Sequence, residues 1–318
     1  MRIQVYDARG VRSGKREELA GLLADPDLFL WVDVEGPSDA DADLLLEVFR
    51  FHPLAVEDTR NQRQRPKVEE YDDHLFVILN PVECPAGEVV FRELDLFLGK
   101  NFAVTVHPAA EPAIDEAERR LNRFEKGKPS AGQLVWALAD TVVDGYFPVL
   151  DAIDERLAEL EDRLLAKPRP AALEELFGLK RSLLELRRVV APQRDMINVL
   201  SRPDYDLVES KEMRYRMRDV YDHLLRVTDM VDTFRDLLTS AVDLYMSAVS
   251  NHLNRVVHRL TVVTVIFGSF AVITGFYGMN FALTWPPFDA RWGVPAALVL
   301  MVGSALALWR IFGHKDEL

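Results

Sequence analysis

The sequence predicts an N-terminal α/β domain, then a long α-helical stalk with a coiled-coil seam, and two transmembrane helices at the C-terminal end. The membrane prediction is the most direct, because one uncharged run covers residues 260–288 and a second covers residues 292–309. A spanning helix needs about 20 apolar residues, and a charge at the centre of the bilayer costs at least about 2.5 kcal/mol. Both runs therefore fit spanning helices joined by a short turn.

The first 130 residues mix short strands with short helices. Helix start signals predict one helix from Ser38 to Arg50 and another from Pro112 to Phe124. Residues 99–101, Gly-Lys-Asn, predict the turn of a hairpin between the last two strands. The predicted strands cover residues 3–6, 29–34, 75–79, 94–98 and 102–106.

The composition changes near Gln133 to residues that favour helices. This region is interrupted by prolines, which predicts several successive long helices. The interruptions are at Pro148, Lys167-Pro168-Arg169-Pro170, Pro192 and Arg202-Pro203.

The last of these helices has the most regular apolar spacing. Its steps of three and four residues predict a coiled-coil seam. The helix can continue beyond this seam, because no Pro or Gly occurs before Gly268. One helix is therefore expected from about residue 209 to 278, a length of about 105 Å. The seam consists of Val220, Leu224, Val227, Val231, Phe234, Leu238, Ala241, Tyr245 and Ala248.

These patterns divide the chain into six segments. The predicted segments are a cytosolic α/β domain (1–130), a cytosolic long-helix stalk (131–259), a first transmembrane helix (260–280), an external loop (281–291), a second transmembrane helix (292–312) and a cytosolic tail (313–318).

Charge and motifs limit the possible functions. With 51 acidic against 38 basic residues and a net charge of −13, nucleic acid is disfavoured as a partner and cations are the natural counter-species. An acidic balance equally serves to keep a soluble domain dispersed. Neither a Gly-rich phosphate loop nor a Ser/His/Asp set occurs in the α/β domain, so we expect no enzyme. Cys84 is the single cysteine, which suits a reducing compartment.

Charges around the two runs predict that both termini lie in the cytoplasm. Basic residues precede the first apolar run and follow the second, while the turn between the runs has only two charged residues, Asp289 and Arg291. Basic residues are enriched on the cytoplasmic side of spanning helices. The first 18 residues have no apolar core, so we expect no secretory signal there. The final Lys-Asp-Glu-Leu spells a retention signal that is read only on lumenal C-termini, so we interpret it as coincidence. The flanking basic residues are Arg255, Arg259, Arg310 and Lys315.

Tyr277-Gly278-Met279-Asn280 closes the first apolar run, and it carries a family resemblance. Several upstream blocks resemble the same family in the same order, and the likeness covers nearly the whole chain. These blocks are His52-Pro53-Leu54 with Glu57-Asp58, Gln64 to Val68, residues 179–190, Arg218 to His223 and Ser250 to Asn254. Together they resemble the CorA family of magnesium transport channels. The resemblance implies a funnel-shaped homopentamer in the cytoplasmic membrane that conducts Mg²⁺, driven by voltage and gated by intracellular Mg²⁺.

Continuing the three-and-four spacing into the membrane selects one small, polar face of the first helix. We interpret this face as pore-lining, because hydroxyls and a carboxamide on one stripe give an ion weak, successive partners. The alternative is that small residues such as Ala271 and Gly275 only allow close helix packing. The stripe consists of Asn254, Val257, Thr261, Thr264, Gly268, Ala271 and Gly275.

The resemblance also assigns roles to individual residues. Gly278, Met279 and Asn280 would form the selectivity filter at the outer mouth, where five Asn280 side chains contact the water shell of Mg²⁺. Val257 and Leu260 resemble an apolar constriction of the pore, whereas Gly268 departs from the bulky apolar residue of relatives.

Regulation is expected from Mg²⁺ bound between cytosolic domains of neighbouring subunits. Asp219 matches the stalk acid of that site, and Glu83 or Glu88 is its candidate partner. The alternative for Asp219 is a solvated helix acid paired with His223 at i,i+4.

Two other functions stay open from the sequence. The first is Zn²⁺ transport, because a zinc branch of the superfamily exists, although Gly-Met-Asn favours Mg²⁺, with Co²⁺ and Ni²⁺ as further possible cargo. His252 and His258 are about 240° apart on a helix, so one chain cannot chelate zinc with both. The second is a membrane-anchored coiled-coil scaffold, which would not need Asn254, Thr261 and Thr264 on one face.

Overall fold

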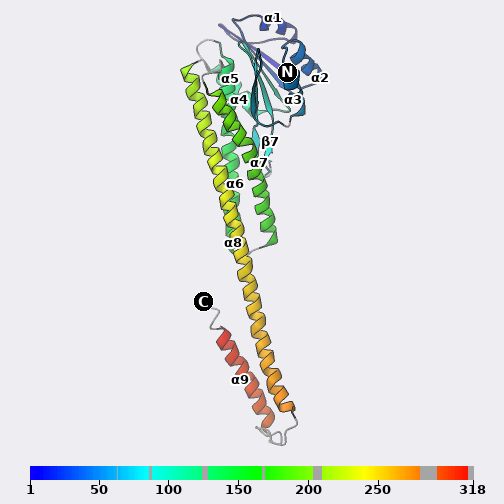
Figure 1. Ribbon diagram of the computed structural model, residues 1–318, viewed down its shortest axis with the longest axis vertical. Coiled ribbons are helices and arrows are strands. Elements are labelled where there is room, and N and C mark those ends of the chain that lie inside the picture. Colours follow the sequence, from blue (N-terminus) through cyan, green and yellow to red (C-terminus); the bar gives the residue numbers. More distant parts are fainter. Residues whose placement is uncertain are drawn as a thin grey trace. The chain divides into compact units, whose positions relative to one another are not determined.

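A computed structural model describes residues 1–62, 64–85, 88–123, 128–166, 169–202, 210–279 and 292–313 of the 318-residue chain (Figure 1). The chain divides into two compact units. The first contains Met1–Arg163 with Arg169–Val242, and the second contains Leu164–Pro168 with Asp243–Leu318.

A seven-stranded sheet forms the centre of the first unit, in the order β2-β1-β3-β9-β8-β5-β4. Only β3 and β9 pair in parallel among the described strands of this sheet, and the other neighbours are antiparallel. The five strands predicted from the sequence are confirmed. The strands are β1 (Arg2–Asp7), β2 (Gly10–Ser13), β3 (Phe29–Glu35), β4 (Lys67–Glu70), β5 (Leu75–Leu79), β8 (Leu94–Leu98) and β9 (Phe102–His107), with a separate pair β6 (Val82–Glu83) and β7 (Val90–Phe91).

The predicted hairpin between β8 and β9 is also confirmed. Its turn is closed by a hydrogen bond from the Gly99 N–H to the Phe102 carbonyl at 2.9 Å. A Cβ on Gly99 would lie 2.2 Å from the Phe102 ring, so a larger residue here would require that ring to move. The Asn101 amide donates to the Leu23 and Asp25 carbonyls at 3.1 and 3.0 Å, which ties the turn to the rest of the domain.

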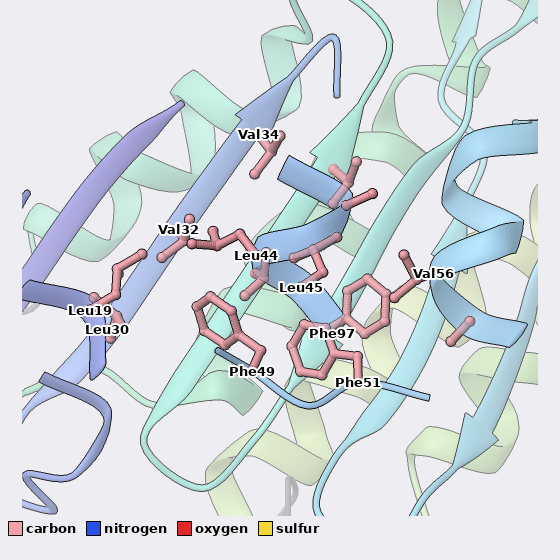
Figure 2. Packing of buried hydrophobic residues seen from close by; sticks show 14 of the residues in the cluster. Leu19, Leu30, Val32, Val34, Leu44, Leu45, Phe49, Phe51, Val56 and Phe97 are labelled. Carbon is pink, nitrogen blue, oxygen red and sulfur yellow. The ribbon is translucent and has the colours of Figure 1, made fainter. Parts of the chain in front are cut away.

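One face of the sheet carries the main apolar core (Figure 2). Short helices α1 (Leu19–Leu23), α2 (Asp39–Glu47) and α3 (Pro53–Asn61) contribute buried residues to it, after a 3-10 turn η1 (Arg16–Glu18). Ser38 caps α2 as predicted, because its hydroxyl accepts the Asp41 N–H at 3.3 Å. The predicted end at Arg50 is wrong: α2 ends at Glu47, and Arg50 has a φ of 56°, which an α-helix cannot contain.

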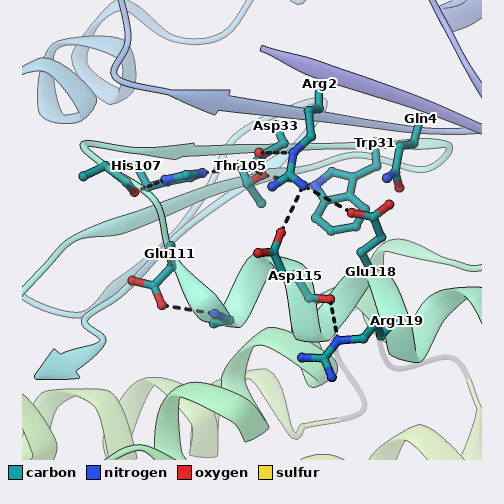
Figure 3. Close-up of polar contacts among 12 residues, drawn as sticks. Arg2, Gln4, Trp31, Asp33, Thr105, His107, Glu111, Asp115, Glu118 and Arg119 are labelled. Carbon is teal, nitrogen blue, oxygen red and sulfur yellow. Dashed lines mark hydrogen bonds and ion pairs between the residues drawn. The ribbon is translucent and has the colours of Figure 1, made fainter.

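The opposite face of the sheet lies under α4 (Pro112–Asn122) and α5 (Ala131–Asp144), and it carries a polar network (Figure 3). Asp33 on β3 is its centre, since its carboxylate accepts from Thr105 at 2.6 Å, from His107 Nε2 at 3.0 Å and from Arg2 Nε at 3.3 Å. The Arg2 guanidinium continues to Asp115 on α4 at 3.0 Å. The network therefore joins β1, β3, β9 and α4.

The helical region follows as α6 (Tyr146–Ala166), α7 (Pro170–Leu200) and α8 (Lys211–Gly278). The predicted interruption at Pro192 is wrong, because Pro192 lies inside α7. Its neighbour Gln193 is fully buried and accepts the Asn80 N–H at 3.1 Å, while Tyr146 donates to the Asn80 carbonyl at 2.7 Å. The contact between Gln193 and Asn80 anchors α7 beside a residue that lacks an N–H. The predicted interruption near Pro148 is confirmed, because α5 ends at Asp144 and Pro148 lies in the first turn of α6.

The predicted apolar seam of α8 is buried from Val220 to Tyr245, and Ala248 is half-buried. Helices α5, α6 and α7 of the same chain pack against this buried part of α8. Arg216 stacks on Trp136 of α5 at 4.4 Å, His223 contacts Phe147 of α6, and Asp232 pairs with Arg187 of α7 at 3.2 Å.

The single helix predicted from about residue 209 to 278 is confirmed as α8, with 68 residues. The C-terminal helix α9 covers Gly293–Gly313. Both α8 and α9 contain a segment long and apolar enough to cross a membrane, and neither segment is buried within the protein. This combination is typical of membrane-spanning helices rather than of core helices.

We predict that Asp33→Asn lowers the free energy of unfolding by about 3–5 kcal/mol, because it breaks a buried pair and leaves its partners unmatched. Burial opposes the ionised Asp33, but hydrogen bonds from His107 and Thr105 bring its pKa below the ordinary value. Burial opposes protonated His107 too, yet the Asp33 carboxylate raises its pKa above the ordinary value.

The sign of the pH dependence follows from these two shifts. Stability from Asp33 is lost as pH falls through its lowered pKa, and stability from His107 is lost as pH rises through its raised pKa. The difference in the free energy of unfolding between wild type and Asp33→Asn should therefore be largest between about pH 4 and pH 6.5. Urea unfolding followed by tryptophan fluorescence measures it, with Asp43→Asn on the exposed face of α2 as control. Equal losses in both variants would contradict the role of the network.

Candidate ion path and cation site

The membrane segment of α8 has one face covered by α9. Half-buried residues recur along it at helical spacing, and the His258 ring contacts the Phe312 ring of α9 with centroids 6.1 Å apart. This face consists of His258, Val262, Ile266, Ser269, Phe270, Ile273 and Tyr277.

All the residues predicted to line the pore lie outside this covered face. At 100° per residue, the mean direction of the stripe lies about 150° from that of the half-buried face. Leu260 is 65% exposed and Val257 is 52% exposed. The stripe thus faces neither α9 nor any other described part of the chain. The exposed positions are Asn254, Val257, Leu260, Thr261, Thr264, Gly268, Ala271 and Gly275.

The glycines of the stripe are not explained by packing within the chain. A Cβ added to Gly268 or Gly275 would meet no described atom within 4 Å. Close approach of α9 therefore does not require glycine at either position.

The threonine hydroxyls of the stripe are oriented by the helix itself. Thr261 donates its hydroxyl hydrogen to the Val257 carbonyl at 2.9 Å, and Thr264 donates to the Leu260 carbonyl at 2.8 Å. With the hydrogen used by the backbone, each oxygen has only lone pairs left for other partners. Such acceptor-only oxygens suit a cation or the water molecules around it.

Helix α8 ends at Gly278, the first residue of the predicted filter. Met279 is 53% exposed, and its N–H donates to the Phe276 carbonyl at 3.3 Å. Asn280, the third predicted filter residue, lies outside the described residues.

Asp219 is exposed on α8, close to a group of cation ligands that the sequence analysis did not single out. Asp140 and Asp144 of α5 and His223 of α8 place one ligand atom each within 4.8 Å of one another. His223 Nδ1 lies 3.6 Å from Asp144, so the structure pairs this histidine with Asp144. The i,i+4 spacing of Asp140 and Asp144 was the available sequence signal, but it does not reveal that α8 packs beside them.

The charges at this cluster are only partly balanced. Asp140 is paired with Arg120 at 2.5 Å, but the neighbouring acids still repel one another. The pKa of Asp144 is raised, first by burial and then by the charge of Asp140, and Asp219 adds to the repulsion. His223 and Arg120 only partly offset it. A divalent ion would relieve this repulsion.

The two candidate partners of Asp219 lie elsewhere on the described chain. Glu83 is held by Arg92 at 2.9 Å, and Arg92 also donates to the Ala110 carbonyl at 2.9 Å. Glu88 is exposed and lines an open groove with Glu174 and Glu175 of α7. No contact of either residue with Asp219 occurs among the described residues of one chain.

An α/β domain, a long helix with an open polar stripe and a second spanning helix define a two-span membrane protein. The chain belongs to the CorA-like Mg²⁺ transporter family, which matches residues 27–315. This is a family of metal-ion transporters rather than enzymes.

Individual relatives agree with this membership. The chain is 35% identical over 292 residues to YfjQ of Bacillus subtilis, covering 91% of this chain and 90% of that protein. It is 32% identical over 294 residues to the cobalt/magnesium transport protein CorA of Thermotoga maritima, covering 91% and 83%. A more distant relative, 25% identical over 253 residues, is the zinc transport protein ZntB of Pectobacterium carotovorum.

A solved structure confirms the fold. The complete CorA magnesium transporter of Methanocaldococcus jannaschii superposes with a TM-score of 0.82 at 24% identity, covering 98% of this chain and 97% of that one.

Proposed function

We propose that this protein is a homopentameric channel that carries Mg²⁺ across the cytoplasmic membrane, with both termini in the cytoplasm. The observation that carries the proposal is the small, polar stripe on α8, which is exposed in the single chain, leads to Gly278 and presents acceptor-only oxygens at Thr261 and Thr264. Related chains named as cobalt/magnesium transport proteins support the choice of ion.

The stripe suits a hydrated ion better than a bare one. Mg²⁺ gives up its water reluctantly and demands octahedral oxygen geometry. Five copies of Thr261 and Thr264 would offer lone pairs to the water shell, and Gly268 and Gly275 would leave room for it. At the mouth, five copies of Gly278, Met279 and Asn280 would form the filter. Each contact is weak, so the ion can leave as well as enter.

Voltage supplies the driving force in this proposal. A divalent ion gains about 4.6 kcal/mol per 100 mV, twice the value for a single charge. Val257 and Leu260 are exposed apolar residues on the same stripe, and five copies of each would close the path by excluding water.

Intracellular Mg²⁺ is proposed to gate the channel through Asp219. The neighbouring Asp140, Asp144 and His223 give α5 and α8 one half of a cation site, and Glu83 or Glu88 of an adjacent subunit would supply the other half. A bound ion would hold neighbouring stalks together, and its loss would let their acids repel each other.

Zn²⁺ is the second candidate cargo, because a zinc transport protein is among the relatives. His252 is exposed and His258 faces α9, so one chain does not direct both histidines at one ion. Co²⁺ and Ni²⁺ are further possible cargo. Membership of a transporter family argues against a scaffold without conduction.

We predict that Asn280→Ala reduces Mg²⁺ uptake by cells at least about tenfold without loss of assembly, because the filter loses its side-chain oxygens. Uptake is measured with a fluorescent Mg²⁺ indicator, and membrane abundance with an immunoblot. Thr274→Ala, on the same helix outside the stripe, is the matched control. Uptake at the wild-type rate in Asn280→Ala would refute the filter assignment.

A second prediction tests the helical phase of the path. In a Cys84→Ser background, single cysteines at Thr264, Gly268 and Ala271 should react with a small hydrophilic thiol reagent in low Mg²⁺. Cysteines at Ile266 and Ile273 should react far less, because thiolate chemistry requires water. Reactivity that follows depth alone, without periodicity, would show that α8 lines no aqueous path.

A third prediction concerns gating. In Asp219→Ala, protection of the cytosolic domain from protease should require an Mg²⁺ concentration about tenfold higher than in wild type, because a charge-assisted ligand is lost. Asp243→Ala, an exposed acid further along α8, should leave the midpoint unchanged. Identical titration midpoints in wild type and Asp219→Ala would return Asp219 to the role of a solvated helix acid.

A further inference from the structure

Two acidic side chains are buried side by side at the start of β8. Glu93 is 4% exposed and Asp95 is fully buried. The two residues are two positions apart on one extended segment, so their side chains point to the same face of the sheet. Asp95 pairs in register with Ile78 of β5 and Val106 of β9, and both belong to the apolar core beneath α2 and α3. A carboxyl group therefore lies within an apolar layer.

The pair has too few hydrogen-bond donors for two ionised carboxylates. Glu93 Oε2 accepts the Gln64 N–H at 2.6 Å. Glu93 Oε1 and both Asp95 carboxylate oxygens have no partner among the described residues. A buried carboxylate without donors is costly. One proton on either residue supplies the missing donor, because a protonated carboxyl can donate to its neighbour.

Among the residues that the structure describes, the charged groups around the pair do not neutralise it. Lys67 of β4 is already shared, at 2.7 Å each, between Asp58 of α3 and Glu69 of β4. His74, next to β5 on the same face, is kept neutral because burial lowers its pKa. Ile78 and Val106, which flank Asp95, are apolar, and the charge of Asp58 on α3 raises the pKa of both acids further.

Burial, and then the charge of Glu93, raises the pKa of Asp95 well above its ordinary value, and burial likewise raises the pKa of Glu93. A metal ion is not the natural ligand here. Among the described residues, the one group of three ligand atoms within 4.8 Å of one another is Asp140, Asp144 and His223.

We propose that Glu93 and Asp95 form a proton-binding site that holds one shared proton at neutral pH and releases it under alkaline conditions. Release leaves two negative charges in the apolar layer between β5 and β9, and the layer under α3 then opens more readily. The cytosolic domain would thereby sense pH separately from Mg²⁺.

The sign of the effect follows from the raised pKa. The folded pair keeps a proton that the unfolded chain loses near pH 4, so the stability of this layer falls as pH rises towards the pKa of the folded pair. The slope for one bound proton is about a factor of ten in the opening equilibrium per pH unit.

Hydrogen exchange of the full-length protein in detergent tests the proposal. After correction for the intrinsic pH dependence of amide exchange, peptides from α3, β4 and β5 should exchange up to about tenfold faster per pH unit between about pH 6 and pH 8. Asp95→Asn should abolish this slope, because a carboxamide donates to Glu93 at every pH. The exposed Asp43→Asn should keep it. An equal slope in wild type and Asp95→Asn would overturn the proposal.

A second measurement does not depend on a folded Asp95 variant. The infrared spectrum of the wild type at neutral pH should contain a protonated carboxylic acid band that is lost at alkaline pH. Glu93→Gln should reduce that band without removing it entirely. The part that is left comes from Glu111, a second buried acid whose pKa is raised by burial. Absence of any alkali-sensitive carboxylic acid band in the wild type would refute a shared proton.

Discussion

The hydrocarbon core of the bilayer offers no hydrogen-bond partner to a polar group, and this constraint governs the second unit of the protein. A helix satisfies its own backbone there, so α8 and α9 can cross. The same constraint acts on side chains. Thr261 and Thr264 donate to carbonyls of their own helix, which satisfies the hydrogen of each hydroxyl but not its oxygen. Each oxygen keeps lone pairs that water or an ion can use, and in the proposed channel these lone pairs connect helix geometry to transport.

Patterns that repeat along one helix or strand could be predicted from the sequence. The five strands, the Ser38 cap and the 68-residue α8 follow from local periodicity and composition. The wrong predictions concern positions where distant contacts decide. Pro192 lies inside α7, next to Gln193, which is buried and accepts a hydrogen bond from the distant Asn80. Arg50 ends α2 through a left-handed backbone that side-chain spacing does not reveal.

The candidate site divides in the same way. The stripe residues are regularly spaced, so their common face could be predicted, and the structure adds that α9 does not cover it. The cluster of Asp140, Asp144 and His223 joins residues about 80 positions apart on α5 and α8, so only tertiary packing reveals it. The same holds for Glu93 and Asp95, where an ordinary strand alternation hides two acids in an apolar layer. Both acidic groups lie in the first unit.

Voltage-dependent Mg²⁺ entry into liposomes tests the central claim most directly. The purified wild-type protein is reconstituted with a fluorescent Mg²⁺ indicator inside the vesicles, and a potassium gradient with valinomycin sets the membrane potential. Channel conduction predicts Mg²⁺ entry without nucleotide, at a rate that rises as the interior becomes more negative. Entry that is no faster than in protein-free liposomes at every potential would contradict the account.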